Sequence, residues 1–232
     1  MLMGPAVIAE PVPVVSAQFT EPTNRYPHNV LGNLPAFAAL NVTLTENTTL
    51  TLRLSESRVF EDIAPRLWDI DSDGIPEIVA VESDQQQGAR LTAWSVRRQP
   101  DGQHIIELRA ASDFIGTRFR WLAPAGIADF TGDGLPEIAY VEMPHLAHRL
   151  VLVRLDGNQF VPVARHDGVS NHRIGDNFIT GGVRDCGNGP DIVMPSADWH
   201  QTMRINYQDG GLTAVSLGPN SDEIAIHAEL SC

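Results

Sequence analysis

The stretch DIDSDGIPEIVAVE, residues 69–82, carries the pattern that decides the fold. It returns sixty residues later (69 to 129) as DFTGDGLPEIAYVE, residues 129–142. A third and shorter copy, DCGNGPDIVM, occupies residues 185–194. Self-similarity at a nearly constant period is the sequence signature of a repeat architecture. We therefore interpret the chain as a series of similar units.

The same succession of segments follows each copy. A short apolar run comes first, and a polar turn and an alternating segment follow it. Each unit then has an Asp-Gly pair before its last strand-like run, at Asp101-Gly102, Asp156-Gly157 and Asp209-Gly210. Asp-Gly between alternating apolar runs is a strong signal of a β-hairpin. No stretch has the apolar periodicity of a helix, so each unit is expected to hold about four short strands.

Units of four strands at a fixed period are typical of propeller blades. We therefore predict an all-β fold, a small β-propeller of about four blades, each a four-stranded antiparallel sheet. A β-sandwich is the alternative, but it does not predict hairpin turns at matched offsets. The alternating run 223–230 is expected to add a C-terminal strand that closes the first blade. The predicted repeats lie near residues 18–56, 57–116, 117–172 and 173–232.

The repeated loops concentrate carboxylates in a pattern that suits a hard cation. Alternate aspartates before a glycine converge in a tight turn, where they repel one another unless a cation compensates them. Oxygen ligands in a flexible loop favour Ca²⁺ over Mg²⁺. The alternative is a pair of solvated turns without an ion. The predicted calcium ligands are Asp69, Asp71, Asp73, Ile75 (through its carbonyl) and Glu77 in the first loop, and Asp129, Thr131, Asp133, Leu135 and Glu137 in the second.

One or two Ca²⁺ ions are expected in these loops. Thr131 is a neutral ligand, so the second loop should bind the ion more weakly than the first. In the shortened third loop Asn188 replaces an aspartate, and we expect no ion there.

The acidic loops, followed by Pro-Glu-Ile-Val or Pro-Glu-Ile-Ala, resemble those of the FG-GAP/VCBS repeat family of β-propellers. Integrin α-subunit head propellers and many bacterial exported proteins are similar. The resemblance covers roughly residues 55–215, and the family's Phe-Gly and Gly-Ala-Pro triplets are absent. It implies calcium in the loops and a binding or scaffolding role, and it implies no chemistry.

An arginine precedes each acidic loop at a nearly constant distance. Arg58 and Arg118 each lie eleven residues before the first aspartate (58 to 69, 118 to 129), and Arg173 lies twelve before Asp185. Arg25 belongs to a similar element upstream. In a propeller these connections meet on one face, where four guanidinium groups would suit a carboxylate or phosphate ligand. The alternative is that each arginine pairs with a nearby acid and braces adjacent blades.

Composition and charge narrow the possible partners. The formal net charge of −13 argues against nucleic acid, because phosphate binding needs a basic surface. No apolar run is long enough to cross a membrane as a helix. Residues 1–17 are interpreted as a signal-peptide remnant or a disordered N-terminus, which suggests a periplasmic or secreted protein. In such an oxidising compartment Cys186 and Cys232 could form a disulfide.

These observations favour a binding or interaction module over an enzyme. Its ligand would lie at the face formed by the blade connections, and its partner would be a protein, a cell-envelope glycan or a small anion. No catalytic residue is assigned, and no Gly-x-Ser-x-Gly elbow occurs. The alternative is a periplasmic or secreted enzyme of polysaccharide lyase or phosphoesterase type with an axial active site. Histidines beside an acid on the arginine face would favour that alternative.

Overall fold

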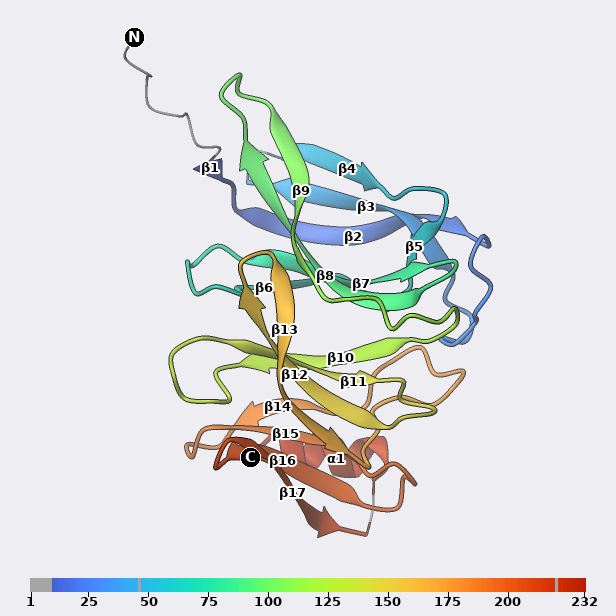
Figure 1. Ribbon diagram of the computed structural model, residues 1–232, viewed down its shortest axis with the longest axis vertical. Helices are drawn as coiled ribbons and strands as arrows, with labels where there is room; N and C mark the ends of the chain where they lie inside the picture. Colours follow the sequence, from blue (N-terminus) through green and yellow to red (C-terminus); the bar gives the residue numbers. More distant parts are fainter. Residues whose placement is uncertain (1–9, 46, 220) are drawn as a thin grey trace.

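The computed structural model describes residues 10–45, 47–219 and 221–232 (Figure 1). Strands make up nearly all of its regular structure, so the predicted all-β class is confirmed. The one helix of the described ranges is the short α1 (Glu223–Leu230). No helix there has the length and apolar character needed to cross a membrane.

The strands form four layers in chain order, called here the first to fourth sheets. The first contains β2 (Val14–Thr23), β3 (Ala36–Leu44) and β4 (Thr49–Arg53). The second contains β6 (Arg66–Trp68), β7 (Glu77–Asp84), β8 (Gly88–Arg98) and β9 (His104–Ala111). The third contains β10 (Leu122–Ala128), β11 (Glu137–Glu142), β12 (Arg149–Asp156) and β13 (Gln159–Asp167). The fourth contains β14 (Gly182–Asp185), β15 (Pro190–Pro195), β16 (Thr202–Gln208) and β17 (Gly211–Gly218).

Sparse pairings link the first three layers into one hydrogen-bonded system. The short β5 (Arg58–Phe60) pairs with both β3 and β7, and one parallel pair, Gln159 with Ala111, joins β13 to β9. Together with β1 (Glu10–Pro11), which pairs with β8, these strands form a 13-stranded sheet. The fourth sheet is a separate antiparallel array in the order β14-β15-β16-β17.

The layers pack face to face, and the inner ones bury both of their faces. On β7, Ile78 and Ala80 pack toward the first sheet, whereas Val79 and Val81 pack toward the third. On β11 the same alternation sends successive residues toward the second and fourth sheets. Because successive side chains of a strand point to opposite faces, a strand segment that packs on both sides is apolar at successive positions, as residues 78–81 of β7 are. This explains the continuous runs that follow the acidic loops.

The stack does not close into a ring. None of the three core clusters contains strand residues from both the first and the fourth sheets within the described ranges. The structure therefore shows four stacked layers, and a closed four-bladed propeller is not shown.

The C-terminal run, predicted as a closing strand, is instead the helix α1. The side chain of Asp222 caps it by accepting the N–H of Ala225 at 2.8 Å, and Glu223 adds a favourable charge in the first turn. Ile226 is buried, and α1 packs on β14 and β15 of the fourth sheet. The prediction was wrong because it relied on the alternation of apolar residues in this segment. The helix propensity of Glu, Ala and Leu, which it left out, favours the observed helix.

The N-terminal prediction also needs correction. Residues 10–11 form β1 and residues 14–17 begin β2, and the side chain of Val14 is buried in the core cluster between the first and second sheets. This part of the predicted disordered or signal-derived segment is therefore ordered strand. Residues 1–9 of that prediction lie outside the described residues.

Burial between layers predicts a large cost for truncating Leu152 on β12, whose side chain is 0% exposed. Leu152→Ala should lower the free energy of unfolding by about 2–5 kcal/mol, because lost transfer energy and a residual cavity add. Urea unfolding measures this loss. The same substitution at Leu108 on β9, which is 42% exposed, is the control and should cost far less. Equal losses at both positions would contradict the stacking.

Candidate metal loop and ligand pocket

The acidic loops and the longer connecting segments occupy opposite sides of the stack. The loops 69–76 and 129–136 project at the left of Figure 1. The segment 24–35 within the first sheet and the connections 112–121 and 170–181 between successive sheets gather at the right. The two sides present different chemistry.

Hydrogen bonds shape the first acidic loop. The carboxylate of Asp69 accepts the N–H groups of Asp73 at 3.2 Å and Gly74 at 2.9 Å. Asp73 in turn accepts the N–H of Ile75 at 2.8 Å. Gly74 has a φ of 86°, a left-handed conformation that glycine adopts at little cost. The loop is therefore a tight turn held by hydrogen bonds from its own backbone to two of its aspartates.

Three of these carboxylates come together. Oxygen atoms of Asp69, Asp71 and Glu77 lie within 4.8 Å of one another. Oδ1 of Asp71 is buried and has no hydrogen-bond partner. Its other oxygen accepts Arg109 Nη2 at 3.0 Å. Such a set of hard oxygen donors fits a divalent cation. Asp73 stands outside this group, although it was predicted as a ligand with Ile75.

Glu77 carries the electrostatic cost of this cluster. Its side chain is buried at the start of β7, and one oxygen accepts the N–H of Ile70 at 3.3 Å. Burial, with repulsion from Asp71 and Asp73, raises the pKa of Glu77 to about 7. The charged form of this carboxyl is therefore disfavoured unless a cation joins the cluster.

The second acidic loop has the same backbone design. Asp129 accepts the N–H groups of Gly132, Asp133 and Gly134 at 2.7, 3.1 and 2.8 Å. Asp133 accepts the N–H of Leu135 at 3.1 Å. That hydrogen bond, together with the nearby guanidinium of Arg154, lowers the pKa of Asp133.

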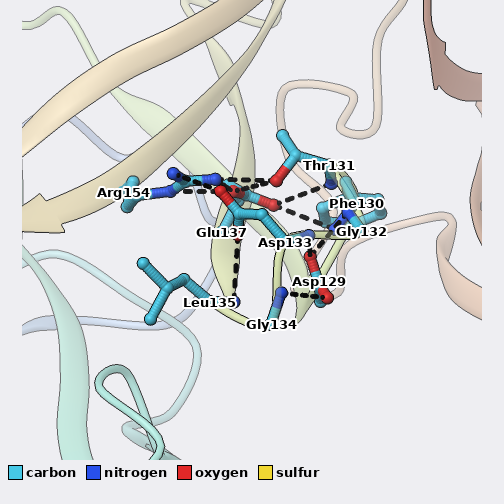
Figure 2. Close-up of polar contacts among 9 residues, drawn as sticks. All are labelled: Asp129, Phe130, Thr131, Gly132, Asp133, Gly134, Leu135, Glu137 and Arg154. Carbon is cyan, nitrogen blue, oxygen red and sulfur yellow. Dashed lines mark hydrogen bonds and ion pairs between the residues drawn. The ribbon is translucent and has the colours of Figure 1, made fainter.

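Two of the three carboxylates of the second loop, those of Asp133 and Glu137, are paired with Arg154, as Figure 2 shows. Arg154 Nη1 lies 2.8 Å from Asp133 Oδ2, and Nε donates to Glu137 Oε1 at 2.9 Å. Arg154 Nη2 also donates to Thr131 Oγ1 at 2.7 Å. The residues predicted as calcium ligands in this loop therefore do not fit an additional divalent cation. Sequence reasoning missed Arg154, although strand register would have placed it opposite Glu137.

The third loop is held by a covalent link. Cys186 in this loop forms a disulfide with Cys232, the last residue after α1. Asp185 accepts the N–H of Gly187 at 2.8 Å. The disulfide thus fastens the C-terminal helix to the fourth sheet.

On the opposite side, connections from all four sheets touch one another. Trp121 Nε1 donates to the carbonyl of Glu61 at 2.7 Å. The backbone N–H of Phe119 donates to the Tyr26 hydroxyl at 2.9 Å, and that of Gly175 donates to the Val30 carbonyl at 3.0 Å. A pocket of about 290 Å³ opens among these connections. It is lined by His28, Val30, Phe119, Arg120, Trp121, Met143, Pro144, His145, Leu146 and Ile174.

One wall of the pocket holds a histidine–carboxylate pair. His28 Nδ1 lies 2.7 Å from Glu61 Oε1, and the Ser83 hydroxyl donates to Glu61 Oε2 at 2.6 Å. Glu61 is buried, and burial raises its pKa while the hydrogen bond from His28 lowers it. In the neutral tautomer whose Nδ1–H donates to Glu61, Nε2 of His28 is an acceptor.

A second histidine pair fixes another acceptor. His172 Nε2 lies 3.0 Å from the carbonyl of Asp176, so this nitrogen carries the proton. His172 Nδ1 then accepts from His145 Nε2 at 2.9 Å, which leaves His145 Nδ1 unprotonated. Burial, with repulsion from neighbouring histidines, lowers the pKa of His145 to about 4. Near pH 7 His145 is therefore a neutral imidazole, and its Nδ1 is an acceptor at the pocket.

The four arginines predicted at this face take separate positions. Arg25 Nε donates to the carbonyl of Arg58 at 3.0 Å, so these two lie together. Arg58 pairs with Glu82 at 3.1 Å. The guanidinium of Arg118 lies 4.4 Å from the ring centre of Phe119, and that of Arg173 lies 4.0 Å from the ring centre of Trp199. Within the described ranges, no hydrogen bond or ion pair joins Arg118 or Arg173 to the first pair, and the arginine that lines the pocket is Arg120.

Comparison with known proteins assigns this chain to no family. The sequence matches no model of a known protein family, and no curated protein matches it. The function proposed next therefore rests on the residues and contacts of the two sites.

The lowered pKa of His145 predicts a pH-dependent contribution to stability. The unfolded chain takes up a proton at an ordinary histidine pKa of about 6.5, whereas the folded protein takes it up only near pH 4. Stability should therefore fall as the pH falls from about 6.5 toward 4, because the unfolded state binds more protons.

His145→Gln removes this titration and keeps a donor for His172. Urea unfolding at several pH values should show the stability of the native protein falling relative to the variant across this window. A difference that does not change between pH 7 and pH 4.5 would contradict the assignment.

Proposed function

We propose that this protein is a calcium-stabilised binding module whose four sheets are the blades of a small, open β-propeller. The ion would sit in the first acidic loop, and the ligand would occupy the histidine-lined pocket on the opposite side. The observation that carries the proposal is the convergence of Asp69, Asp71 and Glu77, with a buried oxygen of Asp71 left unpartnered. The likeness of the loops to those of FG-GAP/VCBS repeats supports the same assignment.

Electrostatics favours an ion in the first loop. Arg109 contacts one oxygen of Asp71, and within the described ranges no cationic side chain forms an ion pair with Asp69 or Glu77. A divalent cation would compensate the remaining negative charge, and it would give Asp71 Oδ1 the partner that this oxygen lacks. Calcium suits a flexible all-oxygen site better than magnesium, which demands near-ideal octahedral geometry. Its role would be to stiffen the turn that leads into β7.

The pocket would select a ligand with hydrogen-bond donors and an apolar surface. His28 and His145 each leave a ring nitrogen as an acceptor, and the exposed side chains of Leu146 and Ile174 flank the pocket. These features suit hydroxyl groups of a cell-envelope glycan or donors of a protein segment better than a small anion, for which Arg120 is the single lining cation. A disulfide is typical of a periplasmic or secreted protein.

A second candidate function is hydrolysis or elimination, of the phosphoesterase or polysaccharide lyase type. The pair of His28 and Glu61 favours it, because a carboxylate on Nδ1 orients an imidazole whose Nε2 can act as a general base. Turnover of bis(p-nitrophenyl) phosphate that His28→Gln abolishes, and that substitution of the exposed His200 leaves intact, would establish this candidate. The binding module predicts no turnover.

Calcium should raise the melting temperature of the native protein. At a concentration one hundred times the dissociation constant, a bound ion adds about 2.7 kcal/mol. For a domain of this size that corresponds to roughly 5–10 °C. Differential scanning calorimetry with Ca²⁺ and with a chelator measures the shift.

Asp71→Asn should remove most of this shift, because it replaces a charged ligand without shortening the side chain. The control is Asp113→Asn at an exposed aspartate outside the loops, which should keep the full shift. A native protein that melts at the same temperature with and without calcium would refute the proposed metal site.

A further inference from the structure

The two acidic loops are similar in sequence, although Thr131 of the second loop stands where the first has Asp71. A further difference lies on the neighbouring strand, at the position opposite the buried glutamate. Glu137 on β11 pairs with Arg154 on β12, and Ile138 pairs with Val153. On β7 the equivalent Ile78 pairs with Trp94 of β8. Continuing that antiparallel register by one residue sets Glu77 opposite Ser95. Ser95 is thus the counterpart of Arg154.

Arg154 supplies a positive charge at the centre of the second loop. Its guanidinium pairs with both Asp133 and Glu137 and bonds the hydroxyl of Thr131, so it touches three of the predicted ligands at once (Figure 2). Glu137 is 0% exposed, and a buried carboxylate without a cation would be strongly disfavoured. The guanidinium therefore compensates the charge that an ion would otherwise have to compensate.

Ser95 leaves the same place in the first loop without a positive charge. Its side chain is too short to bridge the carboxylates, and its hydroxyl oxygen is buried with no hydrogen-bond partner. Arg109 approaches this loop from β9, but it contacts Asp71 and the carbonyl of Gly157 instead of Glu77. Two buried oxygen atoms thus lack a hydrogen-bond partner, Asp71 Oδ1 in the first loop and Ser95 Oγ on the neighbouring strand β8.

We propose that the residue at this register position selects the cation of each loop: Ser95 leaves room for a metal ion, and Arg154 replaces one. The chain then holds a single divalent-cation site instead of two. This inference rests on the proposed uptake of calcium by the first loop. In the second loop, by contrast, the positive charge is the guanidinium of Arg154, which a chelator cannot remove and calcium cannot replace.

Reciprocal exchange of the two residues tests the inference. Isothermal titration with Ca²⁺ after chelator treatment would be run on the native protein, Arg154→Ser, Ser95→Arg and the double variant. The expected stoichiometries are one, two, none and one. Arg154→Gln, which nearly keeps the side-chain length but removes the charge, is a second variant in case the serine leaves a damaging cavity, and it should also gain an ion. Arg149→Ser on the same strand, at an arginine paired with Asp167, is the control and should remain at one.

The outcomes separate this inference from the proposed function. If the native protein binds no calcium but the Arg154 variants bind one ion, the metal site of the first loop is refuted and the replacement by arginine stands. If the native protein binds two ions, or if neither Arg154 variant gains one, the replacement is overturned. Circular dichroism of each variant confirms that it is folded before its stoichiometry is counted.

Discussion

Burial of both faces of the inner sheets is the constraint on which the structure depends. β7 has no exposed residue along its whole length, and β11 is buried at every position except its last. The apolar runs 78–81 and 138–141 of these strands pack on both neighbouring layers, so each layer depends on its neighbours for stability. The fourth sheet, an outer layer, has α1 packed on its strands β14 and β15.

The same burial makes the charged form of the first residue of β7 and of β11 costly, because each is a buried glutamate. Glu77 and Glu137 are the first residues of β7 and β11, and both side chains are buried where the loop meets the strand. A carboxylate in such a place needs backbone N–H donors and a cation. Backbone donors are present in both loops, from Ile70 and from Phe130. The source of the positive charge is what differs between them.

The sequence predicts the repeated parts of this fold well and the contacts between repeats poorly. The β-hairpins follow from local signals such as Asp101-Gly102, which needs only neighbouring residues to form a turn. The pocket could not be found in this way, because His28, His145 and His172 come from connections of different sheets and carry no shared spacing. The arginines had such a spacing, yet Arg118 and Arg173 each lie over a local aromatic ring instead of a common centre. Regular spacing predicts which residues occupy equivalent positions in the repeated units. The contacts of each side chain depend instead on the residues that surround it in its own unit.

The strand β7 connects the two sites physically. It begins at Glu77 in the first acidic loop, and near its other end Ser83 donates to Glu61, the carboxylate that holds His28 at the pocket. Between these two residues every side chain is buried and packed on both faces, so the strand has little freedom to shift its register. Charge compensation at Glu77 therefore acts on the start of the same rigid element that positions the pocket wall. A loop that only closed a hairpin would not need a carboxylate so deeply buried, because an exposed aspartate can form the same turn.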